Sequence, residues 1–178
     1  MESKNKPHLI LAFEHWKKWL TATDTVIDAT CGNGKDTLRL ASLVPEGKVL
    51  ALDIQKDALT QAKKTAPLNH VSFFLQSHIS FPPADRVKLI VYNLGYLPWG
   101  NKALTTLSTT TLQSLEEALK RVSWGGAVSV TCYPGHTEGA LEEKAVFAYA
   151  RGLDPLAWKV SIYQWKETSP SFIWIEKL

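Results

Sequence analysis

A short segment between Val26 and Ile54 constrains the fold more than any other part of the chain. It consists of an apolar run ending in Asp28, a turn with two glycines, a helical stretch, and a second apolar run ending in Asp53. Glycine lets a backbone turn tightly and approach a ligand without interference from a Cβ atom. The pattern is typical of a strand–turn–helix–strand unit that binds a nucleotide cofactor, and Asp53, about 20 residues past the turn, is placed to bind a ribose.

Details of this turn distinguish two classes of cofactor. A dinucleotide fingerprint requires a third glycine where this chain has Thr37, so the close helix–strand packing of that type is not expected. The sequence also lacks a phosphate-binding G-x-x-x-x-G-K-[ST] stretch. Asp28, four residues before Gly32, would repel a pyrophosphate, but it suits a positively charged methionine group, whose ammonium a carboxylate can hold directly or through water. The D-x-x-x-G-x-G sequence therefore predicts S-adenosylmethionine as the cofactor.

Strand and helix patterns alternate along the chain. The predicted strands lie near residues 25–30, 48–54, 70–76, 88–93, 127–133, 158–165 and 171–176. The predicted helices lie near residues 7–20, 35–44, 57–66, 112–121 and 138–151. This order predicts an α/β, Rossmann-like fold with a mostly parallel seven-stranded sheet, helices on both faces, and an antiparallel C-terminal hairpin. We expect one domain over residues 1–178, with an N-terminal helix at about 7–20 and a core at about 24–178.

Composition and charge bear on the cellular location and the partners of such a domain. No apolar run approaches the roughly 20 residues that span a bilayer, and charged residues from Glu14 to Lys18 interrupt the first apolar stretch, so we predict a cytoplasmic protein without a membrane partner. The net charge of +3 permits an RNA partner but is below a strongly basic footprint. Cys31 and Cys132 are predicted to be reduced thiols packed near the cofactor rather than a disulfide or a metal site.

Unusual residues follow several predicted strands. Parallel strands present ligand-binding residues beyond their carboxyl ends, so these segments are expected around one cleft. They are 30–34, Asp53, 76–78, 93–99 and 133–136. Methyl transfer to nitrogen requires a neutral amine, and the protein mainly supplies hydrogen-bond acceptors that orient its N–H groups. The Asn93 amide oxygen is suited to this role, with Tyr96 and Trp99 available to stack on a base; an ordinary strand exit with aromatic packing is the alternative.

If the acceptor is an alkylamine, it also has to lose a proton. Near neutral pH it is largely protonated and cannot attack a methyl group. His136 lies three residues after Tyr133 at the end of the fifth strand, and we hypothesise that it accepts this proton while Asn93 orients the amine. A solvated loop histidine is the alternative interpretation. Ser77 and His78 end the third strand, where methyltransferases of this layout contact adenine; for His78 the alternative is a role in loop packing.

Five segments in order resemble one known family. The segments 28–37, 53–55, 77–78, 93–98 and 133–136 are similar to those of the YtqB-like putative rRNA methylase family of small bacterial proteins, whose members are associated with tRNA 5-aminomethyl-2-thiouridine methylation (MnmM type). The resemblance covers nearly the whole chain. It implies a class I S-adenosylmethionine-dependent methyltransferase fold and methylation of the primary amine on a modified wobble uridine, giving the methylaminomethyl form. The implied partner is RNA, in the form of the tRNA anticodon stem-loop.

The matching motifs assign roles to individual residues. The residues predicted to bind the cofactor are Asp28, Cys31, Gly32, Asn33, Gly34, Asp36, Asp53, Gln55, Ser77, His78 and Asn93. The residues predicted to act in catalysis are Asn93, Tyr96 and His136. The residues predicted to bind the substrate are Leu94, Gly95, Pro98, Trp99 and Tyr133. No metal site is predicted.

The chain departs from the family pattern in two places. The family's Gly-Gly-Asp-Lys is Trp-Gly-Asn-Lys here, at 99–102, and its Asn-Pro-Pro-Phe near the C-terminus is Ser-Pro-Ser-Phe, at 169–172. Asn101 replaces an acid that could pair with the substrate ammonium, so the acceptor is less constrained than the cofactor. An rRNA or small-molecule amine acceptor stays open, as does a non-catalytic nucleotide- or RNA-binding Rossmann-like module. The sequence carries no information on oligomeric state, and a homodimer stays open.

Overall fold

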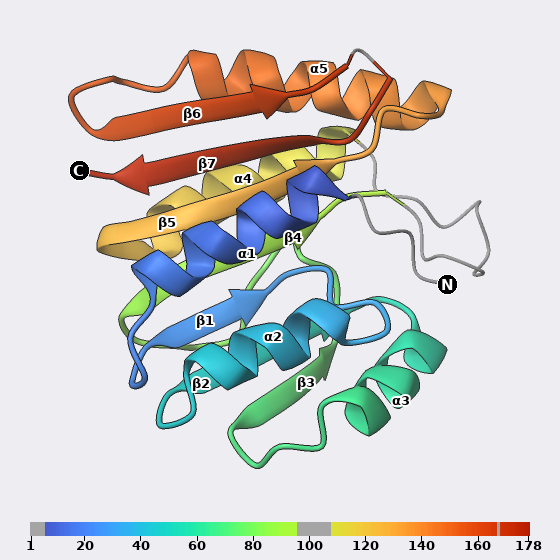
Figure 1. The fold of residues 1–178 in the computed structure, drawn as a ribbon, viewed down its shortest axis with the longest axis vertical. Helices are drawn as coiled ribbons and strands as arrows, with labels where there is room; N and C mark the ends of the chain where they lie inside the picture. The colour runs from blue at the N-terminus through green and yellow to red at the C-terminus, as the bar shows by residue number, and fades with distance from the viewer. Residues whose placement is uncertain (1–5, 96–107, 167) are drawn as a thin grey trace.

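The computed structural model describes residues 6–95, 108–166 and 168–178. Its helices are α1 (Pro7–Trp19), α2 (Lys35–Leu43), α3 (Lys56–Thr65), α4 (Ser108–Arg121) and α5 (Thr137–Arg151). Its strands are β1 (Thr25–Asp28), β2 (Lys48–Asp53), β3 (Val71–Leu75), β4 (Val87–Asn93), β5 (Val122–Cys132), β6 (Trp158–Gln164) and β7 (Ser171–Lys177). Helices and strands alternate from β1 to α5, and the chain closes with two strands (Figure 1).

All seven strands form one sheet in the order β3-β2-β1-β4-β5-β7-β6. Strands β1 to β5 pair in parallel, whereas β7 is antiparallel to both β5 and β6. The predicted mostly parallel sheet with an antiparallel C-terminal hairpin is therefore confirmed. The chain builds outward from β1 to β3 and then returns to the other side of β1 with β4. This reversal makes the carboxyl ends of β1 and β4 the expected ligand-binding edge.

Helices cover both faces of the sheet (Figure 1). Successive side chains of a strand point to opposite faces, and β4 shows this directly. Leu89 and Val91 pack in the cluster that contains residues of α1 and α2, whereas Ile90 and Tyr92 pack with residues of α4 and α5. A strand buried on both faces explains the continuous apolar run in this part of the sequence. No helix in the described ranges is both long and apolar enough to cross a membrane.

Helix α1 lies across the face of the sheet, and its first turn is near the edge where β4 and β5 end (Figure 1). Pro7 is its first residue, where the missing N–H costs nothing and the fixed φ suits a helix. Two turns later the indole N–H of Trp16 donates to the hydroxyl of Ser129 on β5, at 3.0 Å. This buried hydrogen bond fixes α1 against the sheet, and the helix predicted at 7–20 is confirmed.

Helix α4 begins earlier than predicted, at Ser108 rather than near residue 112. The threonines of this stretch favour caps and turns because their hydroxyls compete for backbone groups. Thr111 is fully buried, and its hydroxyl donates to the Glu142 carboxylate of α5 at 2.6 Å. Because this hydroxyl is satisfied by a partner helix, it no longer opposes helix formation.

Strand β5 also begins earlier than predicted. The strand was predicted near residues 127–133, but it starts at Val122 and includes residues 124–126. The pairing of β4 with β5 shifts register between Val87 and Leu89, and Gly125 has a φ of 67°. The irregular pairing and the left-handed glycine let the strand continue through a sequence that looks like a turn.

Candidate active site at the carboxyl ends of β1 and β4

The glycine turn after β1 forms a compact cradle. Gly32 and Gly34 have φ values of 49° and 79°, and Gly34 is the N-cap of α2. A Cβ atom on Gly34 would lie 2.8 Å from the Cα of Ala62 in α3. Asn33, between the two glycines, is half-buried. The turn is therefore held against α3, with the N-terminus of α2 directed at the cradle, an arrangement suited to binding a ligand close to the backbone.

Gly34→Ala is expected to destabilise the protein by about 2 kcal/mol, because alanine is strained at positive φ and its Cβ would collide with backbone atoms of α3. Chemical denaturation of the two proteins measures this difference. Gly135→Ala is the matched control, since a Cβ there meets nothing within 4 Å. Equal stability of Gly34→Ala and the wild type would show that the turn is looser than the structure describes.

Asp53 ties the cradle to the end of β2. Its carboxylate accepts hydrogen bonds from the backbone N–H of Gly32 at 2.9 Å and of Gln55 at 2.8 Å. Burial raises the pKa of Asp53, and these backbone hydrogen bonds oppose the rise. An ionised carboxylate accepts about four hydrogen bonds, so the half-buried Asp53 retains capacity for a ribose hydroxyl pair. Gln55, also half-buried, is the N-cap of α3 beside it.

Asp28 lies beneath the cradle and is only 1% exposed. Its carboxylate accepts a hydrogen bond from the Thr37 hydroxyl at 2.6 Å and a longer one from the Thr30 N–H at 3.4 Å. The sequence suggested that Thr37 loses the helix–strand contact of a third glycine. A different contact takes its place, because Thr37 is fully buried and joins helix to strand through its hydroxyl. The structure thus gives Asp28 a role in holding α2 against β1.

Burial raises the pKa of Asp28 to about 7, while the Thr37 hydroxyl opposes the shift. In the unfolded chain this carboxyl ionises near its ordinary value, so between about pH 4 and pH 7 folding takes up a proton. Stability is therefore expected to fall as pH rises through this window and to level off above it. Asp28→Asn should remove that part of the slope, whereas Asp57→Asn, at an exposed position, should keep it. Urea unfolding from pH 4 to 8 measures this, and an unchanged slope in Asp28→Asn would contradict it.

Cys31 and the residues after β3 lie deeper than the sequence suggested. Cys31 is a buried free thiol that packs with Ala51, Leu59 and Ala62, so only its backbone can face a cofactor. His78 is buried with its ring 5.9 Å from that of Tyr92, edge to face. These contacts direct both side chains into the fold.

Ser77, by contrast, is half-buried, and its hydroxyl accepts a long 3.4 Å hydrogen bond from the Ile79 N–H. Burial lowers the pKa of the neighbouring His78, which favours its neutral imidazole. The adenine-binding role therefore stays a prediction, with Ser77 better placed for it than the His78 ring.

Asn93, the last residue of β4, is held in one orientation by two neighbours. Its backbone N–H donates to the Thr30 hydroxyl at 2.7 Å, which joins β4 to the cofactor turn. Its side-chain Nδ2 donates to Asp36 of α2 at 3.0 Å. An ionised carboxylate only accepts hydrogen bonds, so it fixes which end of the amide is NH₂. The Asn93 Oδ1 is left buried and without a hydrogen-bond partner among the described residues.

Asp36, in the first turn of α2, therefore holds the Asn93 side chain. Its second oxygen makes an ion pair with Arg39 at 3.0 Å, and its side chain is 13% exposed. The residue was predicted to bind the cofactor. The structure shows that its carboxylate already holds Asn93 and Arg39, so any contact with a cofactor would be additional.

The structure corrects part of the prediction made for the segment that follows Asn93. Leu94 was predicted to bind substrate, but its side chain is 1% exposed and packs in the main core cluster. Gly95 has a φ of 129°, and a Cβ there would lie 3.8 Å from Tyr133. Tyr133 is half-buried, and burial together with the Asp36 charge raises its pKa while an interaction with Asn93 opposes the rise. Tyr133 and Gly95 thus line the same region as Asn93.

Three further predicted residues, Tyr96, Pro98 and Trp99, lie outside the described residues. Their predicted roles in catalysis and substrate binding therefore stay predictions. The same holds for Asn101, where the family pattern has an acid.

His136 has a role in the fold that the sequence did not suggest. It is the N-cap of α5, and its Nδ1 accepts the backbone N–H of Gly139 at 3.1 Å. In a neutral imidazole one nitrogen accepts and the other carries the proton. The capping bond therefore places the proton on Nε2 and occupies the lone pair that a base would use. This geometry argues against the hypothesis that His136 accepts the proton. With Nδ1 engaged in the cap, the side chain can act as a hydrogen-bond donor through Nε2.

Two residues near Asn93 were missed by the sequence interpretation. Thr30 contributes the hydroxyl that receives the Asn93 N–H, and His8 of α1 packs against Tyr133 with ring centroids 5.5 Å apart. Thr30 lay within the motif but carried no assigned role. His8 lies 20 residues before Asp28, in a helix recognised only by its apolar periodicity, so nothing local linked it to the site.

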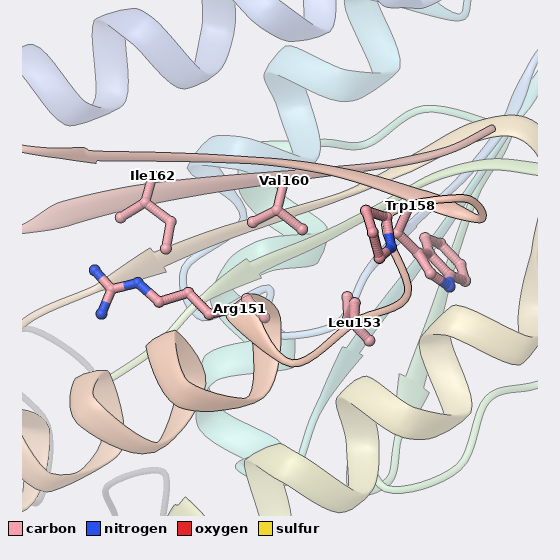
Figure 2. A pocket seen from close by; sticks show the side chains of 7 residues that line it. Arg151, Leu153, Trp158, Val160 and Ile162 are labelled. Atoms are coloured by element: carbon pink, nitrogen blue, oxygen red, sulfur yellow. The ribbon is translucent and has the colours of Figure 1, made fainter.

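A separate hollow lies elsewhere on the molecule (Figure 2). It is about 400 Å³ and lies between the end of α5 and the edge strand β6, lined by apolar side chains and Arg151. Parallel β5 ends at Cys132, and α5 runs back from there, so the end of α5 is remote from the glycine turn. Trp158 and Val160 line this hollow (Figure 2). It contains none of the predicted site residues.

The chain is similar in sequence to known proteins. Residues 49–176 match the family model described as "Putative rRNA methylase". A chloroplastic tRNA (mnm(5)s(2)U34)-methyltransferase from Arabidopsis thaliana is 40% identical over an alignment of 160 residues that covers 80% of this chain and 58% of that protein. The chain thus spans little more than half the length of this relative.

Solved structures show the same architecture over the full length of the chain. A protein described as a putative rRNA-methylase from Clostridium thermocellum superposes with a TM-score of 0.92 and 32% identity, covering 100% of both chains. SMU.1697c, a putative methyltransferase from Streptococcus mutans solved in complex with SAH, gives a TM-score of 0.87 and 29% identity, covering 98% of this chain and 99% of that one. These similarities confirm the predicted class I methyltransferase fold.

Proposed function

Because the chain belongs to the family described as "Putative rRNA methylase", we propose that it is an S-adenosylmethionine-dependent N-methyltransferase acting on RNA. We further propose the amine of 5-aminomethyl-2-thiouridine at the tRNA wobble position as its acceptor, giving 5-methylaminomethyl-2-thiouridine. The observation that carries the proposal is the fixed Asn93 amide: its backbone N–H bonds Thr30 of the cofactor turn, its Nδ2 bonds Asp36, and its buried Oδ1 has no hydrogen-bond partner among the described residues. The relative from Arabidopsis, named for this reaction, supports the choice of acceptor.

The residues of the cradle fit the proposed cofactor. Gly32, Asn33 and Gly34 would lie along its methionine part; both glycines have positive φ, and Gly34 also packs too closely against α3 to admit a Cβ atom. Asp53 would bind the ribose, and Ser77 would lie near the adenine. The SAH bound to the Streptococcus mutans relative supports the choice of cofactor. When bound, S-adenosylmethionine supplies an electrophilic methyl group, whose C–S electron pair stays with the sulfur.

The protein's own part in the reaction is to position the amine. A primary amine has two N–H groups and one lone pair, and only the lone pair can attack. The Asn93 Oδ1 would accept one N–H, with Asp36 holding the amide in place from the other end. Positioning of this kind supplies much of the rate enhancement when reacting atoms are held in line. The neutral amine would form as the ammonium is desolvated and gives its proton to solvent.

RNA would approach the edge that carries Asn93 and Tyr133. Single-stranded bases are commonly bound by stacking on aromatic side chains, and Tyr133 is one such ring. We propose the tRNA anticodon stem-loop as the partner and the cytoplasm as the location, in keeping with the sequence prediction. A homodimer stays a prediction.

The nucleosides of a strain that lacks the gene test this proposal. Mass spectrometry of its tRNA should show loss of 5-methylaminomethyl-2-thiouridine and accumulation of the aminomethyl precursor, because the precursor can no longer be methylated. Complementation with the wild-type gene should restore the product. An unchanged tRNA profile together with loss of a methylated rRNA nucleoside would instead identify rRNA as the acceptor.

A further inference from the structure

His8, in the first turn of α1, is part of the region around Asn93. It is 4% exposed although it belongs to a polar residue type. Its ring meets Tyr133 edge to face at 5.5 Å and Trp165 at 6.4 Å. Tyr133 in turn lies against Gly95 and interacts with Asn93. A helix that precedes the cofactor turn in sequence therefore contributes a side chain to the substrate side of the site.

Two buried polar atoms in this region lack a partner. Among residues 6–95, 108–166 and 168–178, neither the His8 Nε2 nor the Asn93 Oδ1 has a hydrogen-bond partner. A buried polar atom without a hydrogen bond is costly and rare, and functional sites are among the places where it persists. Asp36 connects the two, because its carboxylate bonds Asn93 and its charge acts on His8.

The imidazole of His8 is neutral at physiological pH. Burial and the nearby Lys6 charge together lower its pKa to about 4, although the Asp36 carboxylate opposes the shift. A neutral imidazole with its proton on Nδ1 offers the Nε2 lone pair as an acceptor. It also adds no positive charge beside a cationic sulfonium and an amine that has to stay unprotonated.

We propose that His8 Nε2 and Asn93 Oδ1 accept the two N–H groups of the substrate's primary amine. With both N–H groups held, the nitrogen lone pair is left as the only free position and is directed away from the two acceptors. This inference rests on the proposed function and adds a residue to it. It also explains how the reaction would stop after one methyl group, since a secondary amine has a single N–H and cannot satisfy both acceptors.

Two substitutions at His8 separate hydrogen bonding from packing. His8→Leu keeps an apolar side chain of similar size but has no acceptor, and it should lower kcat/KM for the aminomethyl stem-loop about 10- to 100-fold, as expected for one lost hydrogen bond. His8→Gln keeps an amide oxygen and should recover most of this loss. Cofactor affinity should stay within about twofold in both. His8→Leu should also yield some dimethylated product, because the discrimination between primary and secondary amines is weakened.

His15→Leu is the matched control on the same helix. His15 bonds to the Leu11 carbonyl and packs on aromatic residues of β6 and β7. Any loss of packing should therefore resemble that in His8→Leu, but kcat/KM should be nearly unchanged. A folded His8→Leu variant with wild-type kcat/KM and no dimethylated product would overturn the inference.

Nitrogen NMR of the wild-type protein gives a readout that needs no variant to fold. With S-adenosylhomocysteine present, an anticodon stem-loop carrying 5-aminomethyl-2-thiouridine should shift the ¹⁵N resonance of His8 Nε2, whereas the loop with unmodified uridine should not. Absence of a shift on saturation with the aminomethyl loop would contradict the inference. A wild-type protein that methylates no amine refutes the proposed function itself, whereas active wild type with equally active His8→Leu refutes only the role of His8.

Discussion

Asn93→Ala is expected to reduce kcat for amine methylation about 100- to 1,000-fold while the Kd for S-adenosylmethionine changes less than about threefold. The reason is that the Asn93 side chain meets Asp36 at one end and at the other presents a buried oxygen that has no hydrogen-bond partner in the described part of the chain. Its backbone, which bonds the Thr30 hydroxyl, is retained in the variant, so the cofactor turn should keep its shape. Single-turnover assays with saturating cofactor measure kcat directly, and calorimetry measures the Kd.

The matched control is Asn69→Ala. Asn69 is an exposed amide that precedes β3, so it lies at the amino ends of the parallel strands, away from Asn93. Its removal should leave kcat and the Kd for S-adenosylmethionine unchanged. Asn93→Asp is a stricter companion, because it keeps the shape but places a second carboxylate against Asp36. That variant should also lose most of its activity. Near-normal kcat in Asn93→Ala would show that the Asn93 amide does not orient the substrate amine.

Asp53→Ala carries the second large effect, a weakening of S-adenosylmethionine binding by at least about 100-fold. Its carboxylate accepts the N–H groups of Gly32 and Gln55, and removing it leaves both donors without that partner and loses the predicted bonds to the ribose. Hydrogen bonds to a charged group contribute about 1.5 to 3 kcal/mol each, and tenfold in affinity corresponds to about 1.4 kcal/mol. Calorimetric titration of the folded variant with the cofactor gives the change.

A graded series makes the Asp53 prediction specific. Asp53→Asn keeps one acceptor oxygen and should bind the cofactor with intermediate affinity. Asp85→Ala removes an exposed acid ahead of β4, at the far edge of the sheet, and should bind like the wild type. If Asp53→Ala binds the cofactor normally, the ribose is held elsewhere and the carboxylate serves only to brace the turn.

The sequence predicted the frame of this molecule well, because the frame depends on local patterns. The alternation of strands and helices located every element, and the spacing of Asp28, Gly32 and Asp53 correctly brought the glycine turn together with the end of β2. The predictions that failed involved side-chain direction. Leu94 follows a strand that is buried on both faces, where apolar residues do not alternate with polar ones, so its inward direction could not be inferred from periodicity.

Roles that depend on tertiary contacts could not be inferred from the sequence either. Thr37 was interpreted only as the absence of a third glycine, whereas its hydroxyl donates a hydrogen bond to the buried Asp28. His136 looked like a loop histidine able to take a proton, although its Nδ1 caps α5, a position more often held by serine, threonine, asparagine or aspartate. His8 became part of the site only through its contact with Tyr133, which lies 125 residues further along the chain.

The most direct test of the proposed function uses the purified protein, S-adenosylmethionine and three RNA substrates. These are an anticodon stem-loop with 5-aminomethyl-2-thiouridine, the same loop with unmodified uridine, and unmethylated rRNA. Mass spectrometry of the digested nucleosides should show one methyl group added to the aminomethyl nucleoside and none to the other two substrates. Methyl transfer to rRNA or to unmodified uridine, with the aminomethyl nucleoside left unchanged, would contradict the proposed function.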